Sequence, residues 1–146
     1  MFISTMQENA KTILFIMNDP TLISLYKEPL EAAEYLVDVA IGGEEGLTKI
    51  LNNRYDLVLM QIILEKIQGL DVLSRFYKTG KPHGKIVVFD NLSPQNAAVK
   101  EAFELGVDGY ELMVSLTPVG LATRVKGYLS GAITREESKE RAAEEQ

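Results

Sequence analysis

The side chains most often used in catalysis are sparse in this sequence. Histidine occurs once, as His83 in the turn 80–84, and cysteine is absent. With no cysteine to act as a nucleophile and no second histidine to share a metal ion, His83 is expected to be an ordinary loop residue. The lack of cysteine also excludes disulfides and thiolate metal sites.

Glycines and carboxylates offer two further possibilities, for binding phosphate and for moving protons. The stretch 42–46, GGEEG, lacks the Gly-Lys-Ser/Thr ending of a phosphate-binding loop, and its two glutamates would repel phosphate, so it is better explained as a helix start. Four aspartates are scattered along the chain: Asp56, Asp71, Asp90 and Asp108. Their spacing predicts no acid–base pair, so we expect a protein that is not an enzyme.

The composition is that of an ordinary globular protein. The chain has 146 residues, 46% hydrophobic and 25% charged, which predicts one domain with a substantial core. A formal charge of −6 gives no support for a nucleic-acid partner, because such proteins usually carry a basic face. Residues 1–11 lack the basic run of a signal peptide, and no apolar run is long enough to cross a membrane. A cytoplasmic location is expected.

Five short apolar runs alternate with amphipathic stretches. The runs are residues 12–17, 35–40, 56–62, 85–89 and 110–114. Near-continuous apolar runs of this length predict parallel strands covered on both faces, and their alternation with helices predicts βαβ units. The pattern is that of a flavodoxin-like α/β fold, a three-layer α/β/α sandwich with a five-stranded parallel sheet in order 2-1-3-4-5 and five helices.

Capping residues predict where the last two helices begin. Ser93 followed by Pro94 is a helix start that should run to Gly106, and Thr117 followed by Pro118 is another. The last apolar stripe ends at residue 133, and residues 134–146 are mostly Glu, Lys, Arg and Ala. We therefore predict a core at about residues 11–130 and a solvated polar extension of the last helix at 131–146. A partner-binding or dimer-forming extension is the alternative.

The chain resembles the receiver domain of two-component response regulators from about residue 11 to about residue 129, and four stretches carry the resemblance. Residues 11–20, KTILFIMNDP, are similar to its first strand and acidic turn, and residues 43–47, GEEGL, to the opening of its second helix. Residues 55–70 are similar to its third strand and following loop, and residues 104–110, ELGVDGY, to the joint into its fifth strand. The resemblance implies a receiver-type fold and a role in phosphorelay signal transduction.

The resemblance also implies a set of functional positions at the strand ends. The family uses an aspartate nucleophile, an acidic pair that holds magnesium, a hydroxyl residue and a lysine. The matching positions here carry Gln61 for the nucleophile, Met17 and Asn18 for the acidic pair, Asp90 for the hydroxyl residue and Met113 for the lysine. None of the five keeps the family's chemistry.

Each replacement opposes phosphoryl transfer. The amide of Gln61 lacks the carboxylate oxygen that attacks phosphorus, and the thioether of Met17 has little affinity for a hard cation. Asp90 would repel a phosphoryl group, and Met113 supplies no cation. Asp19, the third residue of the acidic turn, is expected to form an Asx-type turn or to cap a helix. These residues predict a pseudo-receiver that has weak or no magnesium binding and needs no cofactor.

Such a domain would work through protein contacts. Tyr110 stands three residues before Met113, where the family keeps an aromatic side chain that moves between buried and exposed states. It is either a surface handle or a tyrosine packed at the sheet edge with its hydroxyl in water. The resemblance implies a contact face on the fourth helix, fifth strand and fifth helix, for a signalling partner or a homodimer. This face would carry Tyr110, Ala98, Ala102 and Val119.

Two alternatives remain open. A ligand-binding or enzymatic domain of the same fold could reuse the altered strand-end pocket, with a mixed polar and apolar mouth. That mouth would consist of Met17, Asn18, Gln61, Asp90 and Met113. A working receiver could instead be phosphorylated at a displaced acid, Asp19 or Asp90.

Overall fold

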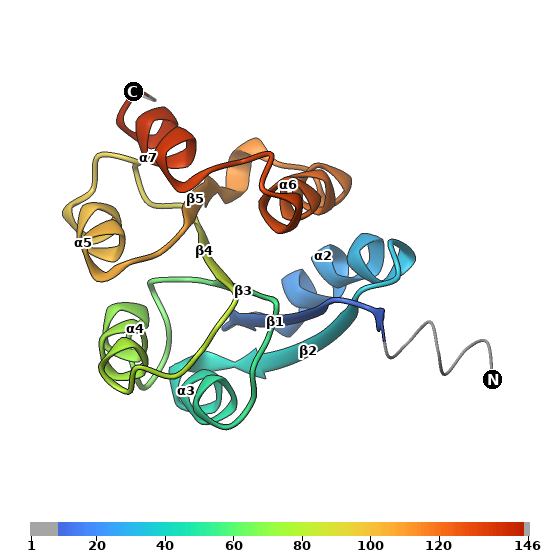
Figure 1. The fold of residues 1–146 in the computed structure, drawn as a ribbon, viewed down its shortest axis with the longest axis horizontal. Coiled ribbons are helices and arrows are strands. Elements are labelled where there is room, and N and C mark those ends of the chain that lie inside the picture. The colour runs from blue at the N-terminus through green and yellow to red at the C-terminus, as the bar shows by residue number, and fades with distance from the viewer. Residues whose placement is uncertain (1–8, 145–146) are drawn as a thin grey trace.

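Five parallel strands form a single sheet in the order β2-β1-β3-β4-β5 in the computed structural model, which describes residues 9–144. The strands are β1 (Thr12–Met17), β2 (Leu36–Ile41), β3 (Leu57–Met60), β4 (Lys85–Asp90) and β5 (Gly109–Leu112). Figure 1 shows the sheet between two layers of helices. The predicted flavodoxin-like fold and its strand order are therefore confirmed.

Alternate residues of the central strands feed two separate hydrophobic clusters. In β1, Leu14 and Ile16 point to one cluster, whereas Phe15 and Met17 point to the other, and all four are fully buried. The same alternation holds in β3 and β4. Apolar residues on both sides of a strand require a cover on both faces, which explains why these strands read as unbroken apolar runs.

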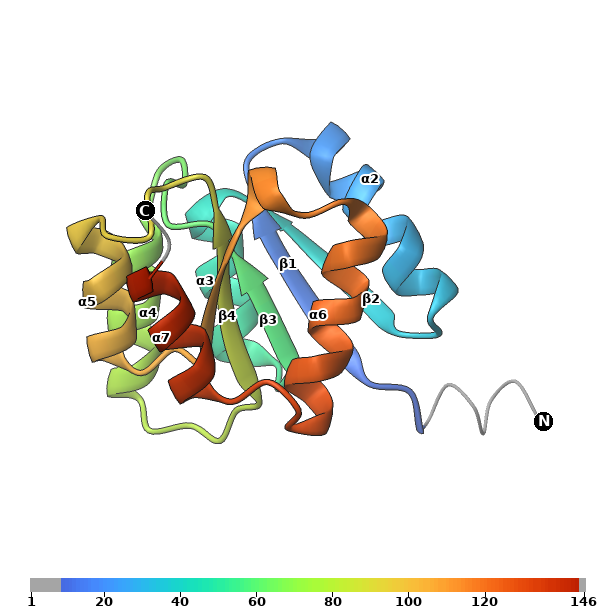
Figure 2. The same ribbon diagram turned by 90° about the horizontal axis from the view of Figure 1, so that it is seen from above.

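The helices divide between the two faces of the sheet (Figures 1 and 2). One face is covered by α2 (Pro20–Ala32) and α6 (Pro118–Ser130). The other is covered by α3 (Gly42–Asn52), α4 (Gly69–Lys78) and α5 (Ala97–Leu105). In the described part of the chain, no helix combines the length and hydropathy needed to cross a bilayer.

Two of the predicted helix starts can be checked against the backbone. Thr117 caps α6, since its hydroxyl accepts a hydrogen bond from the Gly120 amide at 3.0 Å. The predicted cap at Ser93 is wrong: residues 93–96 form a turn, and α5 begins at Ala97 with Asn96 as its cap. The Asn96 side chain accepts from the amide of Ala98, and asparagine is as good a cap as serine.

The prediction that the C-terminal segment extends the last helix is wrong. The segment forms a separate helix. α6 ends at Ser130, where Gly131 takes the left-handed conformation with φ of 84° and turns the chain. The sixth helix of the described chain, α7 (Arg135–Glu144), then runs back against the edge strand β5 (Figure 1). Its Ser138 and Ala142 are buried there, so the segment belongs to the packed structure.

The end of β5 also differs from the predicted run 110–114. The strand stops at Leu112, and residues Met113–Ser115 form a single 3₁₀ turn, η1. Val114 in this turn is 75% exposed, so the apolar sequence runs past the last residue that the sheet can bury. Met113 therefore lies in the loop that follows the strand.

Candidate functional site

The carboxyl ends of β1, β3 and β4 meet at one edge of the sheet, and the predicted positions gather there. We call this the strand-end site and define it by Met17, Asn18, Gln61, Asp90 and Met113. The backbone amide of Asn18 donates to Oε1 of Gln61 at 3.3 Å, which joins the ends of β1 and β3. Parallel strands bring their carboxyl ends to the same side, so residues far apart in the sequence become neighbours.

The side chain of Asn18 holds the loop between β3 and α4. Its Oδ1 accepts from the amide of Glu65 at 2.8 Å, and its Nδ2 donates to the carbonyl of Ile63 at 3.0 Å. Both ends of the amide are thus bonded to the loop backbone. Asn18 acts as a neutral clamp between β1 and this loop.

Asp90 holds the same loop from the side of β4. The residue is 5% exposed, and its Oδ2 accepts from the amides of Ile62 at 2.9 Å and Ile63 at 3.1 Å. Its Oδ1 accepts from the amide of Asn91 at 2.8 Å. Hydrogen bonds to a carboxylate are stronger than neutral ones and compensate for the burial of the group. Asp90 therefore places an anion inside the site, bonded to the amides that follow Gln61.

The two methionines add no polar function. Met17 is fully buried in the cluster under α2 and α6. Met113 is 5% exposed, and its sulfur lies 3.9 Å from Nδ2 of Asn91. Asn91 also accepts from the amide of Val114 through its Oδ1 at 2.9 Å, which ties η1 to the end of β4.

Asp19 has the capping role that the sequence predicts. Its Oδ1 accepts from the amide of Thr21 at 2.9 Å and lies 3.4 Å from the amide of Leu22, at the start of α2. A carboxylate here satisfies amides that have no partner within the helix. Asp19 is exposed and points its charge at the helix end.

The residues of the strand-end site do not fit the magnesium ion that the resemblance associates with it. Magnesium is held by carboxylate and water oxygens in near-octahedral geometry. The position next to β1 offers a thioether and an amide that is already bonded at both ends, and Asp90 is bonded to three amides. Within residues 9–144, no three His, Cys, Asp or Glu side chains are grouped as a metal site would need.

Tyr110 is buried under α7, in neither of the two predicted environments. The residue is 4% exposed, and its hydroxyl lies 2.5 Å from the carbonyl oxygen of Leu92 and 3.1 Å from that of Asp90. Its backbone amide donates to Oγ of Ser138 on α7 at 3.0 Å. The hydroxyl is therefore bonded inside the protein, next to the end of β4.

The four residues of the predicted contact face do not share one surface. Tyr110 and Ala102 are buried, Ala98 is half-buried, and Val119 is 68% exposed at the start of α6. α7 lies over β5 and contributes Ala142 to the cluster that contains Tyr110 and Ala102. A partner that reached this face would first meet α7.

A buried network that the sequence analysis missed joins β5, α6 and α7. Glu111 is 4% exposed; its Oε2 accepts from Arg141 at 2.8 Å and from the hydroxyl of Tyr128, and its Oε1 lies 3.4 Å from Arg124. Burial, and then the nearby charge of Glu111, raise the pKa of Tyr128. A glutamate within an apolar strand run was the available signal, because a buried charge needs a partner.

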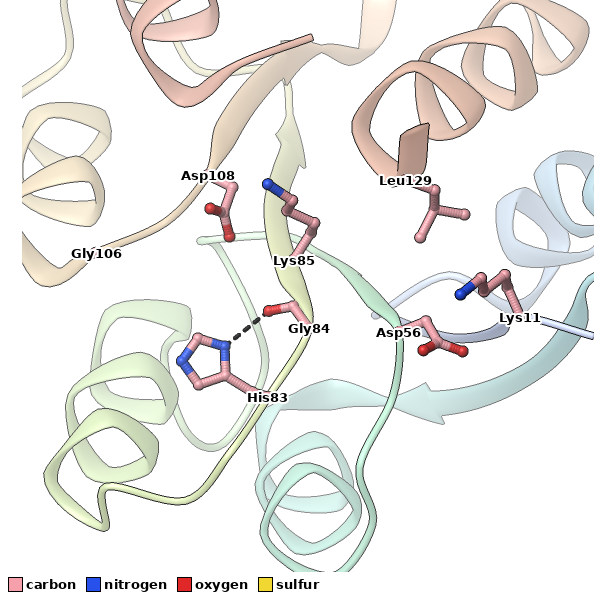
Figure 3. Close-up of a pocket in the computed structure, with 8 residues that line it drawn as sticks. All are labelled: Lys11, Asp56, His83, Gly84, Lys85, Gly106, Asp108 and Leu129. Carbon is pink, nitrogen blue, oxygen red and sulfur yellow. Dashed lines mark hydrogen bonds between the residues drawn. The ribbon is translucent and has the colours of Figure 1, made fainter. Parts of the chain in front are cut away.

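A hollow of about 380 Å³ lies at the opposite, amino-terminal end of the strands (Figure 3). Lys11, Lys85 and Asp108 line it, but its carboxylates serve the backbone: Asp108 accepts from the amide of Ile86 at 2.9 Å. Asp56, which also lines it, accepts from the amide of Thr12 at 2.8 Å.

The remaining groups of this hollow are structural as well. Burial would raise the pKa of Asp56, but hydrogen bonds from Thr12 and Arg54 outweigh burial and lower it. His83 lies in the loop, as predicted, with Nδ1 2.7 Å from the carbonyl oxygen of Gly84 and its ring against Phe76. We assign no chemistry to this end of the sheet.

A doubly wound parallel sheet with polar loops at the carboxyl ends of its strands defines a flavodoxin-like domain. Residues 13–112 match the family described as "Response regulator receiver domain". The chain belongs to this receiver family of two-component systems.

Several relatives support the assignment. The transcriptional regulatory protein DltR of Streptococcus agalactiae is 32% identical over 98 residues, which cover 67% of this chain and 43% of DltR. ResD of Bacillus subtilis is 27% identical over 127 residues, 86% of this chain and 51% of ResD. The chain thus spans about half the length of these curated relatives. A CheY-like receiver domain from Methanospirillum hungatei JF-1 superposes with a TM-score of 0.76 at 26% identity, covering 88% of this chain and 98% of that one.

Proposed function

We propose that the chain is a pseudo-receiver, which takes part in two-component signalling through protein contacts and is not phosphorylated at the usual position. The observation that carries the proposal is the Asp90 carboxylate, bonded to the amides of Ile62 and Ile63 directly after Gln61. These two amides directly follow position 61 in the chain, and an anion of the protein already occupies them.

The chemistry of the neighbouring positions agrees with this proposal. The amide of Gln61 cannot form an acyl phosphate. A phosphoryl group placed near Asp90 would be repelled by about 4 kcal/mol for each unit charge at a separation of about 4 Å in a partly buried setting. Met113 offers no cation to offset this repulsion, and no magnesium ion or other cofactor is needed.

The ligand-binding alternative lacks a specific supporting observation. In residues 9–144, the one buried side-chain oxygen or nitrogen without a hydrogen-bond partner is the hydroxyl of Tyr77. This hydroxyl belongs to α4, and the Tyr77 ring lies against His83, away from the strand-end site. The polar side chains of Asn18 and Asp90 are already paired with the loop, so they are poor anchors for a small molecule.

The test is incubation of the chain with a small phosphodonor such as acetyl phosphate and magnesium, followed by intact-mass measurement. No phosphoryl adduct is expected on the wild-type chain. Two variants serve as matched controls: Gln61→Asp, which restores the nucleophile beside Asp90, and Gln61→Asp combined with Asp90→Thr, which also removes the competing anion. More adduct is expected on the double variant than on the single one. A stable adduct on the wild type, mapped to Asp19 or Asp90, would contradict the proposal.

A further inference from the structure

Polar contacts hold α7 against the edge of the sheet. Arg135 donates to the carbonyl oxygens of Val107 at 3.0 Å and Phe103 at 2.5 Å. The hydroxyl of Ser138 accepts from the amide of Tyr110 on β5, and Arg141 donates to Glu111. β5 is the last strand of the sheet, so α7 covers backbone groups that an open edge would offer to another chain.

α7 does not fill the face that it covers. A groove of about 380 Å³ remains between α5 and α7, and its lining is mainly apolar. Val99 and Phe103 of α5 contribute to this lining, and α7 contributes Lys139 and the small side chains of Ala142 and Ala143. Larger apolar side chains in place of these alanines would bury more surface, which is the main favourable term in association.

The attachment of α7 is also local and short. The helix has ten residues, and isolated helices shorter than about 12 residues are only marginally stable in water. Residues 131–134 link it to α6, beginning at the left-handed Gly131. Another helix could therefore take the place of α7 on the face of β5 and α5.

We propose that the face formed by β5 and α5 is a docking surface for an amphipathic helix of a partner protein, and that α7 occupies this surface until the partner displaces it. The partner helix carries large apolar side chains for the groove beside Val99 and Phe103, and an arginine that replaces Arg141 at Glu111. A helix fits better than a strand because the face is already shaped around one. This inference rests on the proposed signalling through protein contacts.

The first experiment releases α7 in the full chain. Glu140→Pro breaks the helix at an exposed position that makes none of the docking contacts, and Glu140→Ala is the matched control. Hydrogen exchange at the amide of Tyr110 is expected to rise in the proline variant and to stay at the wild-type rate in the control. Arg135→Ala is a second route to release. Unchanged exchange in both Glu140→Pro and Arg135→Ala would overturn the proposal that α7 can be displaced.

The second experiment measures docking of a helical probe. The probe is a fluorescent peptide of residues 133–144 with Ala142→Leu and Ala143→Leu, followed by anisotropy. The Glu140→Pro chain should bind it about tenfold more tightly than the wild type, because a tethered α7 competes at high effective concentration. The Glu140→Ala chain should bind as the wild type does, and a peptide that also carries Arg141→Glu should bind far less.

Three outcomes would contradict this docking proposal. Equal binding of the peptide to all three chains would place it elsewhere on the protein. No binding to a Glu140→Pro chain whose Tyr110 amide is released would show that the face accepts no helix. Dimerisation of the Glu140→Pro chain without peptide, seen by sedimentation, would make a second copy of this chain the occupant. None of these depends on phosphorylation, which the phosphodonor experiment tests separately.

Discussion

Two buried carboxylates lie near the carboxyl ends of the neighbouring strands β4 and β5, and they are satisfied in different ways. Asp90, in the strand-end site, accepts hydrogen bonds from three backbone amides, those of Ile62, Ile63 and Asn91. Glu111, under α7, is satisfied by the side chains of Arg141, Tyr128 and Arg124. One carboxylate is held by main chain and the other by side chains of the two following helices.

The two regions therefore differ in their ability to change state. The amides around Asp90 belong to loops that are fixed at both ends by strands and helices of the core, so they cannot leave without unfolding. Arg141 belongs to α7, a ten-residue helix that residues 131–134 join to α6, so Glu111 can exchange one cation for another. The contacts of the strand-end site are therefore fixed by the core, whereas the helix that covers β5 can be replaced.

The largest expected effect comes from Asp90→Ala. This change leaves the amides of Ile62 and Ile63 without their acceptor, and the free energy of unfolding should fall by about 2–3 kcal/mol. Asp90→Asn is the control, because it keeps one acceptor oxygen, and it should cost about half as much. Urea denaturation followed by circular dichroism measures both. If Asp90→Ala is as stable as the wild type, the loop is not locked by this carboxylate and the comparison fails.

A smaller effect is expected from Arg141→Ala. Glu111 keeps Tyr128 and Arg124 as partners, and the Arg141 side chain is 28% exposed, so the loss in the free energy of unfolding should be about 1 kcal/mol. Hydrogen exchange should rise at α7 and at the amide of Tyr110 but not in the loop after β3. Lys139→Ala, which removes an exposed cation of α7, is the control. A rise spread evenly over the sheet would mean that α7 is not a separate unit.

The sequence was sufficient to predict the sheet, and also that the strand-end residues lie together at one edge of it. Strands buried on both faces have no polar alternation, so β1, β3 and β4 were recognisable from composition alone. Parallel strands then place Asn18, Gln61 and Asp90 at one edge without any knowledge of their contacts. The bonds from Asp90 to the loop amides were not predictable, because they depend on the backbone angles of residues 61–65.

The sequence was misleading for α7. A segment of Glu, Lys, Arg and Ala has no apolar stripe, and the usual reasoning from hydrophobic spacing treats it as solvated. Its docking uses one arginine, Arg135, on two backbone carbonyls and one serine on a strand amide, which no periodicity records. Gly131 was a readable stop signal for α6. Glu111 was the sign that something charged had to cover β5.

The smallest expected effect is a difference in how the two regions loosen as the pH rises. The pKa of Tyr128 is raised in the folded chain, so the folded state favours the protonated hydroxyl. The stability from this group is complete below the unfolded value of about 10 and is lost as the pH rises above it towards the folded value. Raising the pH from 8 to about 11 should therefore loosen α7 before the strand-end loop, as hydrogen exchange at Ser138 and Ile63 would show after correction for intrinsic rates. Tyr128→Phe should remove this selectivity, and equal loosening of both regions in the wild type would speak against it.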